Sequence, residues 1–221
     1  MNKPFIALIF MSSIGLLAQN KPYFGASVGM TVADQIWETG SAIDVSYLWP
    51  QLGLYVGANM EFYNEDVISL MTEFAFVQKG TRLEWAVTDP NEPAFNLGVI
   101  EENYRLNYLQ WWAAIKFKAN WESFQPYVLL GPRIDLQLSE EKAFPNSGVQ
   151  HVSAIFGGIM GGGFQYQPQR KNFRIYVQGN YLMDFRDLHY TSGSDSNTAL
   201  NIRNMAFAFS VGIQTRIIYD R

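Results

Sequence analysis

Charged side chains of both signs recur on the polar faces of segments in which apolar and polar residues alternate. The charged residues on these faces are Glu61, Glu73, Lys79, Arg105, Lys116, Arg133, Asp135, Arg174 and Asp184. Inside a barrel built from these segments, this set is expected to form ion pairs and hydrogen bonds that plug the lumen. An unpaired buried charge is costly, so such a plug needs both signs. A narrow pore or a proton path is the alternative for the same residues.

His151 and Ser153 form a His-x-Ser pair, the arrangement in this chain that most resembles a catalytic set. A serine nucleophile needs an adjacent base and an acid that orients this base. An outer-membrane lipid A deacylase family of similar size uses such a pair, but Gln165 stands here at the position of its acid. We therefore interpret His151 as a loop-edge histidine and predict no catalytic residue.

Neither a metal site nor a cofactor is predicted. A site built from His151 and His189 would need two loops to converge. Cysteine is absent, which excludes disulfides and thiolate ligands. The glycines of 157–163 are not followed by the Gly-Lys-Ser/Thr of a phosphate-binding loop. They are predicted instead to relieve crowding where long side chains fill a small barrel.

Long runs of period-two alternation are the elements that position these residues. The clearest runs lie in 104–138 and are separated by a short turn at 120–123. Side chains alternate across a strand, so each run has one apolar and one polar face. Each run spans roughly 14 residues, about twice the usual globular strand, which is the length expected of tilted strands that cross a bilayer.

The whole chain follows this pattern, and the fold class predicted is all-β. Eight antiparallel strands are predicted, at 23–32, 52–62, 67–85, the two runs of 104–138, 151–167, 173–185 and 204–219. A further short strand at 43–47 stays open. Long connections at 33–51, 86–103, 139–150 and 186–203 alternate with short turns at 63–66, 120–123 and 167–172. Short periplasmic turns, long extracellular loops and an even strand count are typical of transmembrane β-barrels of the bacterial outer membrane.

Aromatic residues gather near the predicted strand ends, as expected at the two interfaces of a membrane. The predicted interface anchors are Trp49, Trp85, Trp121, Tyr166 and Tyr219. Aromatic residues that fill the core of a soluble barrel are the alternative. Charged residues make up only 16% of the chain, and the net charge of −4 gives no sign of a nucleic-acid partner.

The N-terminal segment 1–19 is predicted to be a secretory signal peptide. Lys3 supplies positive charge, 4–17 is apolar, and Ala18-Gln19 offers a cleavage point. A retained membrane helix is the alternative, but the apolar run is too short for one. Residues 20–221 are then expected to form one exported outer-membrane barrel domain.

Several strands resemble those of the PorT-like outer-membrane β-barrel family of the Bacteroidota. Residues 76–80 (FVQKG) resemble its SQKG block, 108–116 (YLQWWAAIK) its YLEIPLLLK strand and 126–132 (PYVLLGP) its YxxAGP strand. The segments from 155, 174 and 207 resemble its last three strands in order, although Trp112 stands where the family usually has proline. The resemblance implies an eight-stranded outer-membrane barrel, and the family's founding member is tied to protein secretion.

These observations predict a non-enzymatic integral outer-membrane protein that serves as an envelope scaffold or a partner-binding component. The expected partners are membrane lipid, lipopolysaccharide and an envelope or secretion protein, and no small-molecule substrate is identified. One alternative is a small outer-membrane enzyme that modifies lipid. Another is a soluble ligand-binding barrel of lipocalin type, whose apolar faces would point inward.

Overall fold

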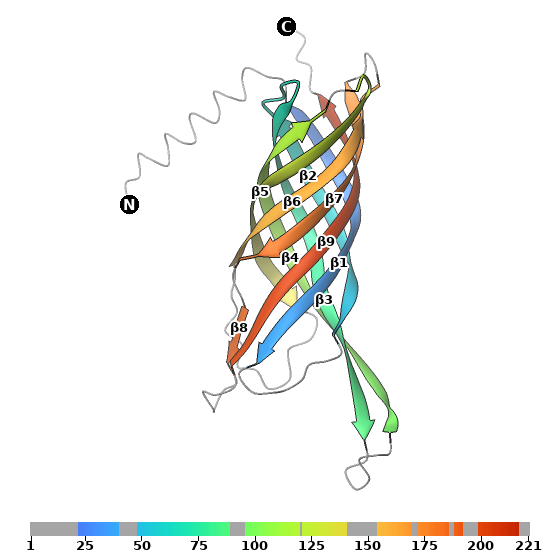
Figure 1. Ribbon diagram of the computed structural model, residues 1–221, viewed down its shortest axis with the longest axis vertical. Coiled ribbons are helices and arrows are strands. Elements are labelled where there is room, and N and C mark those ends of the chain that lie inside the picture. Colours follow the sequence, from blue (N-terminus) through green and yellow to red (C-terminus); the bar gives the residue numbers. More distant parts are fainter. Residues whose placement is uncertain are drawn as a thin grey trace, which may run out of the picture.

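The computed structural model describes residues 22–39, 48–88, 96–119, 121–140, 154–168, 172–185, 188–191 and 199–216. These residues form nine strands and are arranged as an upright barrel (Figure 1). The strands are β1 (Tyr23–Thr39), β2 (Leu48–Phe62), β3 (Ile68–Thr88), β4 (Asn96–Lys118), β5 (Phe124–Glu140), β6 (Ala154–Tyr166), β7 (Phe173–Asp184), β8 (Leu188–Thr191) and β9 (Ala199–Arg216).

Eight long strands close the barrel. Strands β1 to β7 pair antiparallel in chain order, β7 pairs with β9, and β9 pairs back onto β1 from Tyr23↔Arg216 to Thr39↔Leu200. The short strand β8 lies outside this circuit and pairs only with β9. Because the circuit closes, the barrel wall has no unpaired edge, as a structure that spans a bilayer requires. The predicted eight-stranded antiparallel transmembrane barrel is confirmed.

We call the upper end in Figure 1, where β1 begins and β9 ends, the turn end, and the opposite end the loop end. The turns at the turn end are tight. Tyr63 and Glu122 have positive φ values of 48° and 53°. Trp121 and Phe124 exchange both backbone hydrogen bonds, at 3.2 and 2.9 Å, across the two residues between them. The predicted turns at 63–66 and 120–123 therefore lie where they were expected.

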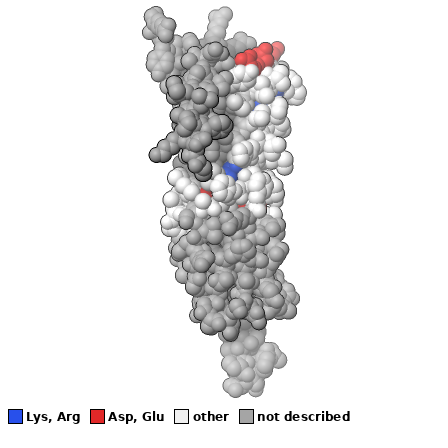
Figure 2. Space-filling model, turned by 90° about the vertical axis from the view of Figure 1, so that its left-hand side faces the viewer, with Lys and Arg blue, Asp and Glu red and all other residues white. Residues whose placement is uncertain are grey.

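The two faces of the barrel wall have opposite character. Large apolar side chains point outward: Val28 is 58% exposed, Leu130 61% and Phe209 54%. Most of the charged and amide side chains of the same strands are buried inside. Figure 2 shows that the described flank is largely uncharged and that acidic atoms gather at the turn end. An outward apolar face suits lipid and contradicts the lipocalin-type alternative, which needs the apolar face inside.

Three of the predicted long connections, 33–51, 86–103 and 186–203, contain more strand than predicted. Strand β3 runs to Thr88 and β4 begins at Asn96, so most of the predicted loop 86–103 is a paired hairpin, with Trp85↔Ile100 among its pairs. In Figure 1 this hairpin stands out beyond the loop end of the barrel. Its acidic and amide residues gave the segment the composition of a loop, but apolar residues still alternate through it. Strand β8 and the start of β9 likewise lie within the predicted loop 186–203. The open strand at 43–47 lies outside the described residues.

A closed barrel of this kind is expected to be heat-modifiable. Folded in detergent and run unboiled on a gel, the protein should migrate differently from the boiled sample, because the hydrogen-bonded wall resists detergent until it is heated. The gel is run on membrane fractions. Recovery of the protein in the soluble periplasmic fraction, with no shift on boiling, would contradict the transmembrane fold.

Candidate functional site

Side chains from all eight long strands fill the interior of the barrel. One row across the wall shows how the strands position them. Glu73 of β3 lies beside Trp112 of β4, Trp112 beside Arg133 of β5, Arg133 beside Gly157 of β6, and Gly157 beside Asp184 of β7. Residues paired in register share a face of the sheet, so the side chains of this row all point into the lumen.

Glycines make room for the long side chains of this interior. The guanidinium of Arg133 lies over Gly157, where an added Cβ would come within 3.1 Å of Nε. Gly57 lies beneath the Glu73 carboxylate in the same way, and Gly161 lies beneath the amide of Asn180. The predicted role of the glycines of 157–163, to relieve crowding in a filled barrel, is confirmed at Gly157 and Gly161.

A balanced group of charges lies toward the loop end, and we call Lys79, Arg133, Asp135 and Asp184 the loop-end cluster. Lys79 Nζ lies 2.5 Å from Asp135 Oδ2 and 3.7 Å from Asp184 Oδ1. Arg133 Nη1 lies 3.0 Å from Asp135 Oδ2, and its Nη2 donates to Asp184. Gln110 Nε2 donates to the second Asp135 oxygen at 2.9 Å. Two cations thus meet two carboxylates in a fully buried layer.

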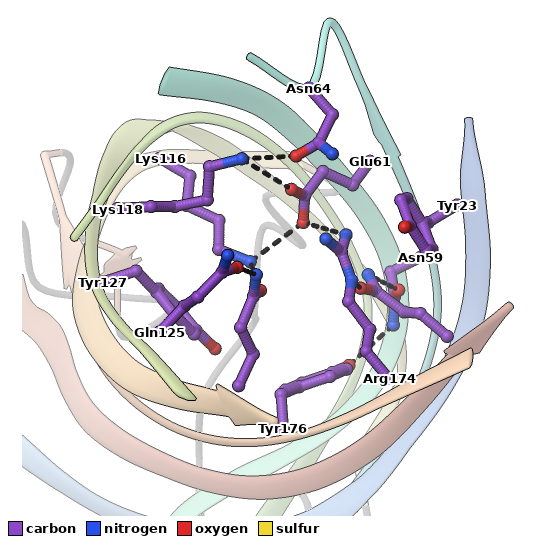
Figure 3. A network of polar contacts seen from close by, with 12 residues as sticks. Tyr23, Asn59, Glu61, Asn64, Lys116, Lys118, Gln125, Tyr127, Arg174 and Tyr176 are labelled. Carbon is purple, nitrogen blue, oxygen red and sulfur yellow. Dashed lines mark hydrogen bonds and ion pairs between the residues drawn. The ribbon is translucent and has the colours of Figure 1, made fainter. Parts of the chain in front are cut away.

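Near the turn end, three cations share a single buried carboxylate. In this turn-end cluster, Glu61 Oε2 lies 2.9 Å from Lys116 Nζ and 2.5 Å from Arg174 Nη2, while Lys118 Nζ lies 4.0 Å from Glu61 Oε1. Figure 3 shows these side chains converging from opposite walls on the one carboxylate. Lys116 and Arg174 therefore depend on Glu61, whereas Lys118 is also attracted by Asp66 and Glu65 of the adjacent turn.

Neutral groups take the remaining donors of the turn-end cluster. Lys116 Nζ lies 3.9 Å from the ring centre of Tyr127, and the guanidinium of Arg174 lies 3.9 Å from that of Tyr23. Aromatic faces attract cations electrostatically. Amide oxygens complete the set: Gln165 for Lys116 (2.6 Å), Gln214 for Arg174 (2.6 Å) and Asn64 for Lys118. Acceptors without charge thus stabilise the excess cations.

Glu73 lies between the two clusters and has a different environment. Its Oε1 accepts hydrogen bonds from Ser27 Oγ and Tyr55 Oη, both at 2.8 Å, and the Trp112 indole lies behind Tyr55 with its Nε1 3.5 Å from the hydroxyl. Among the described residues, no cation forms a salt bridge with this carboxylate. Glu73 is 1% exposed, so bulk solvent does not screen its carboxylate.

The structure brings the predicted lumen residues together, with one exception. Glu61, Glu73 and Lys116 are buried in the interior, as are Lys79, Arg133, Asp135, Arg174 and Asp184. Arg105 is half-buried and lies on the opposite face of β4 from the buried Tyr104 and Leu106. The even-numbered residues of β4 from Tyr104 to Lys118 face the lumen without interruption, so the odd-numbered Arg105 points outward. The prediction of Arg105 as a lumen residue is therefore corrected.

The structure describes the side chains of three of the five predicted interface anchors. Trp121 (66% exposed) and Tyr166 lie at the turn end, and Trp49 lies on the outer surface near the loop end. The side chain of Trp85 and all of Tyr219 lie outside the described residues. The same holds for the predicted signal segment 1–19, for His151 and Ser153, and for the side chain of His189.

Several lumen residues were missed because only charged residues were counted. Tyr55, Trp112 and Tyr176 are buried inside, and Tyr23, which lies near a strand end, faces the lumen at 1% exposure. The signal that identifies them is their place in the alternation, on the same face as the charged residues. Among the residues that the structure describes, no group of three His, Cys, Asp or Glu side chains could hold a metal ion. The same residues contain no helix long and apolar enough to cross a membrane.

Comparison with solved structures supports the fold. The chain is similar to the outer membrane protein OprG of Pseudomonas aeruginosa, with 11% identity and a TM-score of 0.58, over 88% of this chain and 96% of OprG. It also matches Neisserial surface protein A, at 14% identity and a TM-score of 0.45, over 90% of this chain and 98% of that one. The outer membrane protease OmpT of Escherichia coli matches at 9% identity and a TM-score of 0.45, over 89% and 96% of the two chains.

Sequence comparison identifies the family. No curated protein sequence matches the chain. The sequence profile of the outer membrane protein beta-barrel domain matches residues 17–190, which is most of the chain. Together with a closed eight-stranded wall whose outer face is apolar, this match shows that the chain belongs to the outer membrane protein beta-barrel domain family.

Proposed function

We propose that this protein is a non-enzymatic outer-membrane barrel with a plugged lumen, which acts as an envelope scaffold and binds its partner at the loop end. The observation that carries the proposal is the filled interior. The loop-end cluster, the Glu73 layer and the turn-end cluster follow one another along the barrel, and all of their charged side chains are buried. An eight-stranded barrel is just wide enough for side chains to fill it.

A plugged lumen is expected to carry no steady current. Purified protein inserted into planar bilayers should show little or no stable conductance, because charged and aromatic side chains occupy the path that ions would follow. A general porin inserted under the same conditions serves as the positive control. Large, long-lived channels would refute the plug and favour the narrow-pore interpretation of the same residues.

A link to protein secretion is a narrower form of the proposal, supported by the resemblance of 76–80, 108–116 and 126–132 to the PorT-like family. It is tested by deleting the gene and measuring secreted protein and envelope permeability. The second candidate is a lipid-modifying enzyme, for which the His151 and Ser153 pair is the only motivation. Mass spectra of lipid A from the deletion strain decide it: an unchanged profile supports the non-enzymatic proposal.

A further inference from the structure

Arg105 is a cation on the outer wall of a transmembrane barrel, where most of the side chains are apolar. A charge on the lipid face is costly at the middle of the bilayer and costs little near its interface. The position of Arg105 therefore indicates that the hydrocarbon layer ends below it. The outward-facing side chains of β3, β4 and β5 show where this edge lies.

A row of hydrogen-bonded polar side chains crosses the outer wall next to Arg105, and we call Gln78, Asn107 and Ser139 the outer ladder. These three residues are paired in register across β3, β4 and β5. Gln78 Nε2 donates to Asn107 Oδ1 at 3.0 Å, and Asn107 Nδ2 donates to Ser139 Oγ at 2.9 Å. The backbone N–H of Leu54 donates to Gln78 Oε1 at 3.1 Å. A row of amides and hydroxyls on a lipid-facing wall is expected at the interface rather than in hydrocarbon.

Between the outer ladder and the turn end, the outer wall is apolar. In β4 the outward residues of 109–117 are apolar, and in β3 Thr72 is the polar exception among those of 68–76. The Thr72 hydroxyl has its partners within the wall, because it donates to the Trp112 backbone carbonyl at 2.8 Å and accepts from Trp111 Nε1 at 3.0 Å. This stretch of wall therefore suits hydrocarbon.

The height of this apolar band matches a bilayer. Positions 68 and 78 of β3 are separated by about 33 Å of extended strand, which gives a height of about 25 Å at a strand tilt of about 40°. The apolar band of outer-membrane barrels has about this height. The outer ladder therefore marks the edge of the hydrocarbon layer on the side of the loop end.

Two arginines lie just beyond this edge. Arg105 lies two residues beyond Asn107 along β4, and Arg82 lies four residues beyond Gln78 along β3. These steps place them about 5 and about 10 Å above the outer ladder. The headgroup layer of a bilayer is about 5–8 Å thick on each side, and arginine side chains are long enough to direct their charge into it. Both guanidiniums therefore lie within reach of lipid headgroups.

The protein itself also holds these two arginines. Arg82 Nη1 lies 3.7 Å from Glu101 Oε2, in an ion pair whose side chains are 39% and 56% exposed, and Arg105 has an interaction of its own. A guanidinium carries five N–H donors, so it can keep such a partner and still bind a phosphate with other donors. Trp49, which is 49% exposed, is paired in register with Arg82, and an indole at this level is typical of the interface. The backbone pair Glu84↔Glu101 lies one step further from the membrane.

We propose that Arg105 and Arg82 bind the phosphate groups of a phosphorylated glycolipid, of the lipopolysaccharide class, in the outer leaflet beside the loop end. The planar guanidinium matches two phosphate oxygens at once, which a solvated lysine does less well. This inference rests on the partner-binding part of the proposed function and names a lipid as that partner.

Fluorescent lipid A, the phosphorylated anchor of lipopolysaccharide, tests the proposal by anisotropy with the full chain in neutral detergent micelles. It should bind at least about tenfold more tightly than the same lipid without its phosphates. The double variant Arg82→Gln/Arg105→Gln should remove most of this difference. Arg216→Gln is the matched control and should leave binding unchanged, because Arg216 is half-buried at the turn end, over the ring of Tyr23.

The position of the membrane edge is tested separately in lipid nanodiscs. The chain contains no cysteine, so Leu109→Cys and Asn103→Cys can each carry one fluorescent dye on the outer face of β4, on opposite sides of the outer ladder. A water-soluble quencher should reach the dye at 103 and not the dye at 109. Equal quenching at the two positions would remove the edge from the outer ladder and overturn the proposal.

The binding experiment can overturn the proposal in three further ways. Equal affinity for the two lipids would remove the role of phosphate, and an unaffected double variant would remove the role of the two arginines. Displacement of the lipid by excess inorganic phosphate would make a free anion the occupant. A heat-modifiability gel shows that each variant is folded. None of these measurements depends on the conductance of the barrel, so the lipid site and the plugged lumen can fail independently.

Discussion

Replacing Glu61 by glutamine is expected to destabilise the barrel by about 3–5 kcal/mol, because the change leaves buried cations without their counter-charge. Lys116 and Arg174 both form short ion pairs with one oxygen of Glu61, and Lys118 lies within 4.0 Å of the other. Neutral acceptors surround these cations, but no second carboxylate forms a salt bridge with Lys116 or Arg174 among the described residues. Lys116 and Arg174 therefore depend on this one side chain.

The same substitution at Glu73 is expected to leave stability unchanged or to raise it. Glu73 has hydroxyl partners, Ser27 and Tyr55, and no described salt bridge. The carbonyl oxygen of glutamine can accept both of these hydrogen bonds, so the loss is small. The gain is that a charged form of the side chain no longer has to be buried without a cation. Two buried glutamates in one barrel should thus respond in opposite directions to one change.

Urea unfolding in detergent micelles, followed by tryptophan fluorescence, measures both effects as shifts of the midpoint. Glu122→Gln, at an exposed turn, is the control: it measures the effect on stability of removing a carboxylate that is not buried. Equal destabilisation by Glu61→Gln and Glu73→Gln would show that Glu73 has an ionic partner of its own. A Glu61→Gln variant as stable as the parent would show that the neutral acceptors suffice for the three cations.

Much of the fold follows from alternation alone. The apolar positions from Leu109 to Phe117 and from Val128 to Leu136 recur every second residue, and the structure places them on the outer face. The alternation of long and short connections then indicated which end of the barrel carries the turns and which the loops. The prediction was wrong where composition outweighed pattern, as in the β3–β4 hairpin, where the carboxylates and amides of 86–103 indicated a loop although apolar residues such as Val87 and Ile100 alternate with them.

The partners inside the lumen could not be predicted in the same way. Alternation shows that Lys79 and Asp184 face inward, but it does not show that they lie at one level. That depends on the stagger between strands, which decides that Arg133 of β5 reaches Asp184 of β7 across Gly157. Arg105 shows a second limit. Charged residues near Arg105 lie on both faces of the barrel wall. Arg105 is assigned to the outer face only when the alternation of β4 is followed without interruption from its buried positions.

Replacing Gly29 by alanine is expected to destabilise the closed barrel by about 1–3 kcal/mol, the usual cost of overpacking a dense interior. Gly29 of β1 lies opposite Ser210 of β9, at the seam where the last strand meets the first. An added Cβ would lie 2.7 Å from Ser210 Cα and 2.8 Å from the carbonyl carbon of Phe209, and nearer still to its oxygen. These are backbone atoms and cannot rotate away, so relief requires a shift of the seam itself.

Gly179→Ala is the matched control on the other side of β9. Gly179 of β7 lies opposite Phe209, but its added Cβ would meet only the Phe209 ring, at 3.5 Å, which is an ordinary contact on the lipid face. This variant should be as stable as the parent, or up to about 1 kcal/mol more stable because alanine restricts the unfolded chain. Urea unfolding and the unboiled gel band compare the two variants. Both glycines lie in long strands beside β9, so equal destabilisation by the two variants would point to a general loss of strand flexibility. A loss of stability confined to Gly29→Ala would support close backbone packing between β1 and β9 at the seam.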